Sequence, residues 1–519
     1  DAISMTLEDA LELNVTGWFQ WRLFAICGLA FMTDSLGVNL LSFLTTCAAV
    51  DWNLSDASQA TLTGIVFAGM IIGSIFWGRF AEEFGRKKTL LYACLLVTLG
   101  GFASAIAPSY PILVLFRAVA GFGVGGASIP FDLLAEFLPV ANRSPFLVYM
   151  GIFWTLGAMF VAGVAWTVLP VLGWRFLAFI TTIPVLITTA LAFMYIPESP
   201  RWLMTKGRDL EAARLIRDAA LVNGVIMPEF TLIPAVDEPS MDNGKDASYW
   251  ELVSSHAAQK ITIPLWVIWG SFGFSYYGVI LFVSRVYSNQ DAVTSGGAPS
   301  CQFDYLAIFS NAAAEIVSVV ISAGLIDYLG RLKSQSIFYA LGGLAVMCMG
   351  VSVSPGSLLF FSILARMCVN SGLVATWVVT PELFCTHTRT MGHSSCTAIS
   401  RIGSFIASFV VVSRLPYWTV GLVLGLFNIC AALATFWLPD TSGKMLDEVN
   451  ALTLQKIDSG VSSQDYSLID SSSSHFGEAC SRITTTTTTT NAMHPRAGAG
   501  HSAARCTLYE TGSELTPFA

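Results

Sequence analysis

The hydrophobic residues of this chain are gathered into long stretches, separated by short connections rich in charged and turn-forming residues. A helix that crosses a bilayer needs about 20 mainly apolar residues, because each residue advances it by ~1.5 Å. Twelve stretches approach this length. The predicted spans are 22–44, 59–80, 89–107, 111–138, 146–170 and 174–196, then 260–284, 304–329, 335–353, 357–380, 390–414 and 417–438. The pattern predicts an all-α membrane protein with about twelve transmembrane helices.

The connections divide the chain into five parts. Residues 1–21 form an N-terminal segment, 22–196 a first helix bundle and 197–259 a polar central loop. Residues 260–438 form a second bundle. Residues 439–519 are rich in Ser and Thr and too polar to bury a core, so we expect a disordered tail.

A charged hairpin occurs twice between these stretches. The first copy contains Gly78, Glu82, Gly85 and Arg86, and the second contains Asp327, Gly330 and Arg331. Asp327 follows Glu82 by 245 residues, and Glu382 follows Glu136 by 246. A nearly constant offset between matching charges indicates a duplication, so the two six-helix bundles are predicted to be pseudo-symmetric.

Composition agrees with an integral membrane protein. The mean hydropathy is +0.64, hydrophobic residues make up 54% of the chain and charged residues only 12%. The net charge of −8 then belongs to loops and tails and does not indicate a nucleic-acid partner. The sequence has no ATP-hydrolysing motif, metal-ligand spacing or catalytic triad. We therefore expect no enzyme and no cofactor, and the lipid bilayer as a partner.

Lys and Arg in the short loops predict the orientation, because positive residues are retained on the cytoplasmic side. They concentrate in alternate connections, while the opposite side offers mainly Arg285 and Arg414. Both termini are therefore predicted to be cytoplasmic. Cys47 and Cys301 fall on the predicted outer side, where an oxidising environment permits a disulfide. Spacing does not show whether they lie close together, so this pairing stays open.

Several motifs resemble the major facilitator superfamily. The hairpin is similar to its Gly-x-x-x-Asp-x-x-Gly-Arg-Arg/Lys motif, with Glu82 in place of the usual Asp. The central loop opens with Pro197-Glu198-Ser199-Pro200-Arg201, as in the sugar and organic-ion branches. The segment 125–132 and Ser400-Arg401-Ile402-Gly403 resemble the synaptic-vesicle-two-related and organic ion transporter group. The resemblance covers residues 14–450 and implies a secondary transporter that works by alternating access.

The hairpins also have a physical interpretation of their own. An acid at a helix end can pair with Arg86 or Arg331 and hold helix ends together while the other side is open. We predict such a conformational latch; the alternative is that these charges only set topology. Two acid–arginine pairs at equivalent places, Glu136 with Arg143 and Glu382 with Arg389, are interpreted as structural or gating pairs. The latch candidates are Gly78, Glu82, Gly85, Arg86, Glu136, Arg143, Glu198, Arg201, Asp327, Gly330, Arg331, Glu382 and Arg389.

Other charges fall deep inside predicted spans, where an ion persists mainly when it serves a partner or a pathway. They are Asp34, Arg117, Asp132, Glu315, Arg366 and Arg401. Both signs of charge around one cavity suit a carrier of a polar solute, and Asp34, Glu315 and Asp132 are candidate proton carriers. The alternative is that Asp34 with Arg117, or Glu315 with Arg366, neutralise each other for packing.

Arg401 is the candidate substrate contact, because a guanidinium holds a carboxylate by two parallel hydrogen bonds. The organic-anion carriers that the chain resembles have an Arg at this place, whereas organic-cation carriers tend to have an acid. The alternative is that Glu315 holds Arg401 and leaves no charge for a ligand. Tyr276 and Tyr277 are candidates for stacking on a flat solute.

One hypothesis follows: a monomer that moves a small organic anion or zwitterion by proton-coupled alternating access, in the plasma membrane or an intracellular vesicle membrane. A sugar or organic-cation carrier is the nearest alternative, since these branches share the Pro197–Arg201 motif. A receptor or scaffold without net flux is a further alternative, supported by the Ser/Thr-rich tail.

Overall fold

The computed structural model describes residues 3–14, 16–233, 251–254, 256–288, 301–384, 389–413 and 415–439. The tail that we expect to be disordered lies outside them, except for its first residue. The first half contains α2 (Trp18–Trp52), α3 (Asp56–Phe84), α4 (Arg86–Ala105), α5 (Tyr110–Val124), α6 (Ile129–Ala135), α7 (Val140–Tyr149) and α8 (Gly151–Tyr195). The second half contains α11 (Glu251–Ser254), α12 (His256–Tyr287), α14 (Tyr305–Leu329), α15 (Arg331–Val351), α16 (Pro355–Leu383), α17 (Arg389–Val412) and α18 (Tyr417–Thr435).

The helices of the described residues make twelve membrane crossings. Eleven segments are long and apolar enough to cross a bilayer. One of them, Pro145–Tyr195, has 51 residues, about twice what a bilayer of ~30 Å requires. Its backbone leaves helical geometry at Gly173, so this segment crosses twice. The predicted all-α fold with about twelve transmembrane helices is confirmed.

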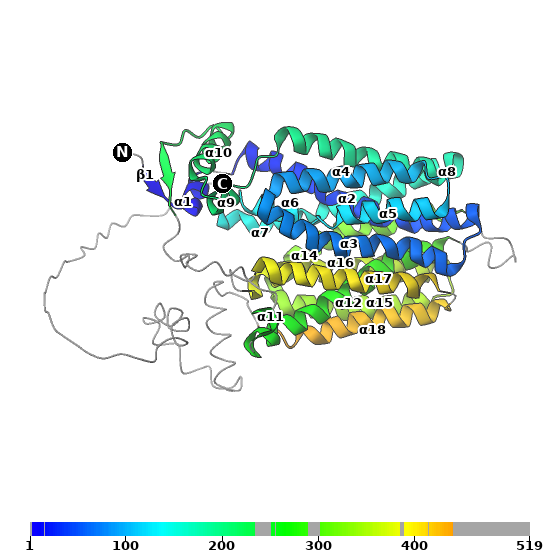
Figure 1. The fold of residues 1–519 in the computed structure, drawn as a ribbon. Helices are drawn as coiled ribbons and strands as arrows, with labels where there is room; N and C mark the ends of the chain where they lie inside the picture. The colour runs from blue at the N-terminus through cyan, green and yellow to red at the C-terminus, as the bar shows by residue number, and fades with distance from the viewer. Residues whose placement is uncertain are drawn as a thin grey trace, which may run out of the picture. The chain divides into compact units, whose positions relative to one another are not determined.

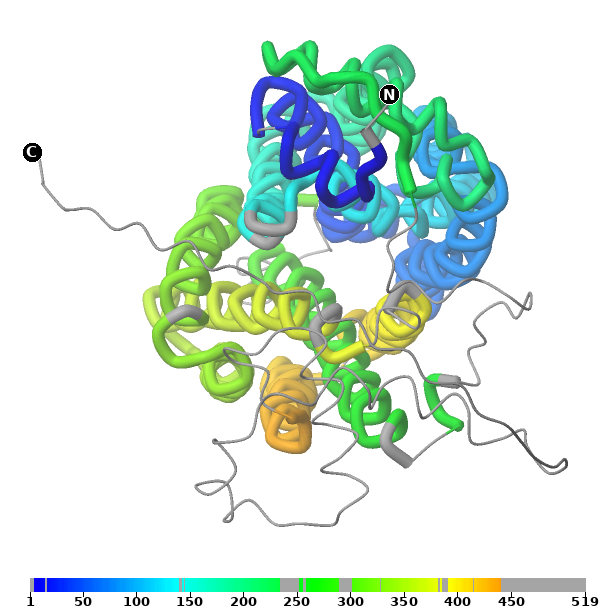
Figure 2. Tube along the Cα trace, turned by 90° about the vertical axis from the view of Figure 1, so that its left-hand side faces the viewer, coloured from blue at the N-terminus to red at the C-terminus, as the bar shows by residue number. Residues whose placement is uncertain are grey.

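The two halves are built alike. α2 packs along α8 as α12 packs along α17, and α4 packs on α5 as α15 packs on α16. In Figure 1 the helices of the first half lie together above most of those of the second half. Figure 2, which looks along the helix axes, shows the same two groups. The predicted pair of pseudo-symmetric bundles is therefore confirmed.

Each charged hairpin turns on a glycine in the left-handed region. Gly85 has φ 100° and joins α3 to α4, and Gly330 has φ 85° and joins α14 to α15. A residue with a Cβ is strained at such angles, so both copies need glycine there. We call this end of the bundles the hairpin end. We call the opposite end the disulfide end, because Cys47 and Cys301 are bonded there.

Residues 3–13 and 200–232 form one small folded unit at the hairpin end. It consists of β1 (Ile3–Met5), α1 (Leu7–Leu13), α9 (Pro200–Thr205), α10 (Asp209–Val222) and β2 (Phe230–Leu232). β1 and β2 pair in parallel, and Leu11, Trp202 and Ile216 lie in their common core. Strands of three residues leave no readable periodicity, so the hydrophobic pattern does not predict this unit.

Asn223, directly after α10, joins this unit to α2. Its Oδ1 accepts a hydrogen bond from the Phe19 amide at 2.9 Å, and its Nδ2 donates to Gln20 Oε1 at 2.8 Å. The first N–H groups of a helix have no partner within the helix, so Asn223 caps α2 from more than 200 positions away along the sequence. α2 accordingly begins at Trp18, four residues before the predicted start.

The two bundles touch at both ends. At the disulfide end Cys47 of α2 is bonded to Cys301, with their Cα atoms 4.9 Å apart, and the rings of Phe43 and Phe303 are 5.0 Å apart. The disulfide that the sequence left open is thus present and ties the two halves together. At the hairpin end Phe131 of α6 stacks on Trp377 of α16 at 5.0 Å. The structure therefore describes a state in which the bundles are in contact at both ends.

Candidate functional site

Arg401, midway along α17, bonds to an acid of the opposite bundle. Its Nη2 lies 2.6 Å from Oδ2 of Asp34 on α2, and its Nη1 lies 2.5 Å from the hydroxyl oxygen of Tyr277 on α12. The side chains of Arg401 and Asp34 are only 8% and 1% exposed. We call Asp34, Arg401 and Tyr277 the cross-bundle triad, because its ion pair joins the two bundles within their spans.

Two glycines bring Arg401 beside Tyr277. A Cβ on Gly273 of α12 would overlap the carbonyl of Ser400, and a Cβ on Gly403 of α17 would overlap the carbonyl of Gly270. Small residues let transmembrane helices approach closely. The close contact of α12 and α17 positions the arginine before any ligand is involved.

A second triad of the same residue types lies inside the second bundle. Glu315 of α14 has its Oε1 2.8 Å from Nη2 of Arg366 on α16, and the same oxygen accepts a hydrogen bond from Tyr276 of α12 at 3.1 Å. The side chains of Arg366 and Glu315 are 4% and 0% exposed. We call these three residues the single-bundle triad. The pairing of Glu315 with Arg366, which the sequence held open, is present, and Arg401 is held by Asp34 and not by Glu315.

Aromatic rings connect the two triads. The rings of Tyr276 and Tyr277 are 5.6 Å apart, and each lies about 6 Å from the ring of Trp154 on α8. Phe272 stacks on Tyr276 at 5.4 Å. The indole Nε1 of Trp154 is buried without a hydrogen-bond partner. These rings place flat apolar faces and one free donor next to both arginines, as expected of a site for a small organic solute.

A small cavity lies between the bundles, on the disulfide-end side of the triads. Polar side chains line it on several sides: Asn39 and Ser42 of α2, Ser284 of α12, Asn311 of α14 and Arg366 of α16. About 10 Å³ of it can hold the centre of a water molecule, which is room for about one water. This state therefore has no space for an organic solute at this position.

Two predicted site residues lie outside both triads. Arg117 donates from Nε to the hydroxyl of Ser104 on α4 at 2.9 Å. The suggested pairing of Arg117 with Asp34 is therefore wrong, because α5 packs against α3 and α4 inside the first bundle. Asp132 of α6 lies one turn before Glu136 and within electrostatic range of Arg86, at the hairpin end.

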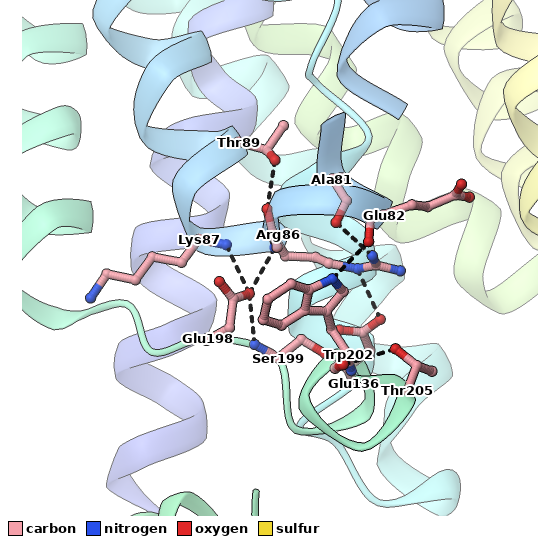
Figure 3. Close-up of polar contacts among 11 residues, drawn as sticks. Ala81, Glu82, Arg86, Lys87, Thr89, Glu136, Glu198, Ser199, Trp202 and Thr205 are labelled. Atoms are coloured by element: carbon pink, nitrogen blue, oxygen red, sulfur yellow. Dashed lines mark hydrogen bonds and ion pairs between the residues drawn. The ribbon is translucent and has the colours of Figure 1, made fainter. Parts of the chain in front are cut away.

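Glu198 is the centre of the polar network at the hairpin end (Figure 3). Its Oε1 accepts hydrogen bonds from the amides of Arg86 at 2.7 Å, Lys87 at 3.1 Å and Ser199 at 3.0 Å. The carboxylate thus caps the start of α4, where free N–H groups and the helix dipole favour a negative charge. A side chain at Gly85 would overlap this carboxylate, so the turn and the cap depend on each other.

Arg86 pairs with an acid outside its own hairpin. Its Nε lies 3.5 Å from Oε1 of Glu136, and its Nη1 donates to the carbonyl of Ala81 at 2.9 Å. The side chain of Glu82 is exposed and points away, while its carbonyl accepts a hydrogen bond from Trp202 at 2.9 Å. Arg86 therefore pairs with Glu136 and not with the acid of its own hairpin, because the turn at Gly85 reverses the chain between Glu82 and Arg86.

The remaining latch candidates are placed as follows. Arg201 pairs with Glu8 of α1 at 3.4 Å. Arg143 donates to the carbonyl of Leu138 at 3.4 Å, and Gly78 has open space beside it. In the second hairpin Gly330 and Arg331 form the equivalent turn. The side chains of Asp327, Glu382 and Arg389 lie outside the described residues, so their pairing stays a prediction.

Comparisons with known proteins agree with this architecture. Residues 45–452 match the family described as Sugar (and other) transporter. The chain is 31% identical over 457 residues to putative transporter svop-1 of Caenorhabditis elegans, covering 85% of this chain and 87% of that protein. It is 32% identical over 459 residues to synaptic vesicle 2-related protein of Bos taurus, covering 85% and 82%. It is 27% identical over 493 residues to organic cation/carnitine transporter 7 of Arabidopsis thaliana, covering 86% and 97%.

Solved structures share the fold at lower sequence identity. The inward open conformation of the xylose transporter XylE from E. coli superimposes with a TM-score of 0.62 at 21% identity, covering 83% of this chain and 99% of that chain. The major facilitator superfamily proton:xylose symporter XylE bound to 6-bromo-6-deoxy-D-glucose gives a TM-score of 0.62 at 20% identity, covering 84% and 99%. Identities this low carry the fold alone.

Proposed function

Because the chain belongs to the sugar (and other) transporter family of the major facilitator superfamily, we propose that it moves a small organic anion or zwitterion across a membrane by proton-coupled alternating access. Membership makes it a multi-pass membrane transporter and not an enzyme. Carnitine, named in one relative, is a zwitterion with a carboxylate. The proposal names a substrate class and a coupling ion that go beyond this membership.

The cross-bundle triad is the observation that carries the proposal. Arg401 already holds one carboxylate, that of Asp34, across the boundary between the bundles. A solute carboxylate offers the same two oxygens and can replace Asp34 on the guanidinium. This exchange removes a contact that holds the bundles together at their middle, so solute binding and bundle separation become one event.

Protons enter the cycle through the buried acids. When Asp34 or Glu315 binds a proton, its arginine loses an anionic partner, whereas arginine itself stays charged. A protonated Asp34 therefore leaves Arg401 free for a solute carboxylate. Uptake of a proton and binding of an anion then favour the same state, which is the requirement for symport.

Membrane location and orientation are part of the proposal. The hairpin end carries Arg86, Lys87 and Lys88 beside the small folded unit, and we assign it to the cytoplasm by the excess of positive charge. Both termini are then cytoplasmic. The names of the synaptic vesicle 2-related proteins favour a vesicle membrane, and we assign the transport unit to a monomer because one chain supplies both bundles.

Uptake into proteoliposomes tests the proposal. Labelled carboxylates, sugars and amines are offered at two external pH values, and counterflow is measured. A carboxylate should be transported, faster at acidic external pH, and Arg401→Lys should lose this activity because a lysine cannot form the paired contact. Arg117→Lys is the matched control, since Arg117 is a buried arginine outside both triads. Flux of carboxylates that is unchanged in Arg401→Lys would contradict the proposal, and the absence of any counterflow would favour a receptor or scaffold.

A second candidate is a carrier of organic cations. Asp34 Oδ1 and Glu315 Oε2 are buried without hydrogen-bond partners, and Trp154, Tyr276 and Tyr277 offer ring faces that attract cations. Under this alternative amines are transported and Arg401→Ala retains their flux, so the same screen separates the two candidates.

A further inference from the structure

The single-bundle triad is more than a neutralised pair. Glu315 keeps its Oε2 without a hydrogen-bond partner, and Arg366 keeps its Nε in the same condition. Both atoms are buried, where an unsatisfied polar group costs about 1–3 kcal/mol. A water or a proton can fill a position of this kind.

A row of polar side chains lies between the disulfide end and this triad. Tyr287 of α12 follows Ser284 by one turn, and its main chain bonds to Asp304, which is exposed. The Tyr287 hydroxyl lies 3.1 Å from the Ser362 hydroxyl, and either of the two can donate. Asn311 donates from Nδ2 to Ser362 at 3.0 Å. The Tyr287 hydroxyl, Ser362 and Asn311 thus form one hydrogen-bonded row inside the bundle, and the ring of Tyr287 separates this row from the main chain at the disulfide end.

The row ends one helical turn from the acid and its arginine. Asn311 precedes Glu315 by four residues on α14, and Ser362 precedes Arg366 by four residues on α16, which is ~6 Å in each case. Asn311 and Arg366 both border the one-water cavity. The unpartnered Oδ1 of Asn311 is an acceptor and the unpartnered Nε of Arg366 is a donor. One water in the cavity can bond to both atoms, and Arg366 joins this position to Glu315 through their ion pair.

The surroundings of Glu315 contain few other charges. Arg366 of α16 and Tyr276 of α12 are the groups that act on it. α8 carries no charged residue between Gly151 and Gly173. The charges of α7 and α15, Arg143, Arg331 and Lys333, sit at the hairpin end. Protonation of Glu315 therefore alters one local ion pair and leaves the contact between the bundles intact, whereas Asp34 cannot leave Arg401 without breaking that contact.

We propose that Glu315 is the acid that carries the coupled proton, and that Tyr287, Ser362 and Asn311 hold in place the water in the cavity through which this proton reaches it from the disulfide end. This inference rests on the proposed function and gives the two acids different roles. Asp34 controls access of the solute to Arg401, and Glu315 carries the proton. A hydronium gives its proton to Glu315 Oε2, and the same proton returns to water at the hairpin end. O–H bonds are the only bonds that form and break.

Infrared difference spectroscopy of the purified full chain in lipid nanodiscs tests this without any solute. Stepping the pH should produce the C=O stretch of a protonated carboxylic acid, and Glu315→Gln should remove that band while Asp34→Asn retains it. The proposal is overturned by a band that survives in Glu315→Gln, or by one that Asp34→Asn removes. If the uptake screen finds no transport, the proposed function is contradicted, but the protonation of Glu315 can still be measured by its infrared band.

The rate at which Glu315 exchanges its proton for deuterium tests the path. Asn311→Leu should slow exchange of the band by about tenfold or more, because proton transfer depends on positioned groups. Tyr287→Phe and Ser362→Ala remove single hydroxyls and keep the test open if Asn311→Leu fails to fold. Asn370→Leu is the control, since Asn370 bonds to Ser318 on the hairpin-end side of Glu315 at 2.8 Å, and should leave the rate unchanged. Slowing by Asn370→Leu without slowing by the other three variants would overturn the path.

Discussion

The two buried triads have the same composition, an acid, an arginine and a tyrosine, but they connect different parts of the protein. Tyr276 and Tyr277 are neighbours in α12, yet one hydroxyl bonds to Glu315 within its own bundle and the other to Arg401, which is held by Asp34 of the opposite bundle. A contact between the bundles must break when they separate, whereas a contact within one bundle moves as a unit. We therefore expect equal chemistry to serve two purposes: control of bundle movement by the cross-bundle triad, and storage of a proton by the single-bundle triad.

The largest expected effect separates the two triads by function. Neutralising both members of the cross-bundle pair, Asp34→Asn with Arg401→Gln, should reduce carboxylate counterflow by about 100-fold, since a lost charge-assisted contact is worth ~3 kcal/mol. The equivalent change in the single-bundle pair, Glu315→Gln with Arg366→Gln, should keep counterflow within about threefold of wild type, because the bundle contact and Arg401 remain. Equal losses of counterflow in the two double variants would contradict the proposal that the triads have different roles.

Stability should respond in the same way for both triads. Arg401→Gln leaves Asp34 buried without a partner, and Arg366→Gln does the same to Glu315, so each single change should cost ~3–5 kcal/mol of folding stability. Removing the acid as well should recover much of this cost. Thermal unfolding of the single and double variants in nanodiscs measures the loss of stability and its recovery for each triad. A recovery confined to one triad would show that the buried pairs differ in more than their connections.

A substitution in the first hairpin should lower the stability of the fold and leave the rate of solute counterflow unchanged. Gly85→Ala forces a Cβ into the left-handed region and onto the Glu198 carboxylate, which should cost ~1–2 kcal/mol or more. Gly78→Ala is the matched control in the same hairpin, because nothing lies within 4 Å of its added Cβ. Melting temperatures should fall for Gly85→Ala alone, with counterflow per folded molecule unchanged. Loss of counterflow in Gly85→Ala at full stability would make this hairpin a moving part.

The disulfide gives a milder test of the same rule, because it also ties the bundles together. Replacing both members, Cys47→Ser with Cys301→Ser, should speed counterflow about threefold, which corresponds to ~0.6 kcal/mol. A reducing agent should produce the same gain in wild type and none in the double variant. Cys94→Ser, a buried free cysteine of α4, is the control. If transport is unaffected by breaking the disulfide, the Cys301 segment moves together with the first bundle.

The smallest effect is expected at the surface of the small folded unit. Arg208 bonds to Glu211 at 2.9 Å and holds the pKa of that carboxyl below its ordinary value. A lowered pKa means that the pair stabilises the fold at neutral pH and loses this contribution as acid protonates Glu211. Both groups are exposed, so Glu211→Gln should leave the melting temperature at pH 7 nearly unchanged. A clear drop at pH 7 would show that this unit supports the bundles more strongly than its surface contacts indicate.

Hydropathy and the repeated hairpin were sufficient to predict the architecture, because both act locally. Crossing a bilayer demands a minimum run of apolar residues, and each such run is visible without knowing its neighbours. The turn glycines Gly85 and Gly330 likewise report a backbone requirement of their own position. The small unit of β1 and β2 escaped prediction, since two strands of three residues become stable only by pairing across 227 positions.

The amino-acid sequence by itself determined which charges are buried, because a charged residue inside a long apolar run belongs to a membrane-spanning helix. Which charges meet was decided by tertiary structure alone. Asp34 and Arg401 are 367 positions apart, and their pairing depends on how two bundles face each other and on how closely α12 approaches α17. Likewise Arg86 turns to Glu136 and not to Glu82, three residues before the turn, because Gly85 reverses the chain between them. Electrostatic attraction depends on distance in space, so the separation of two residues along the sequence does not predict which charges form an ion pair.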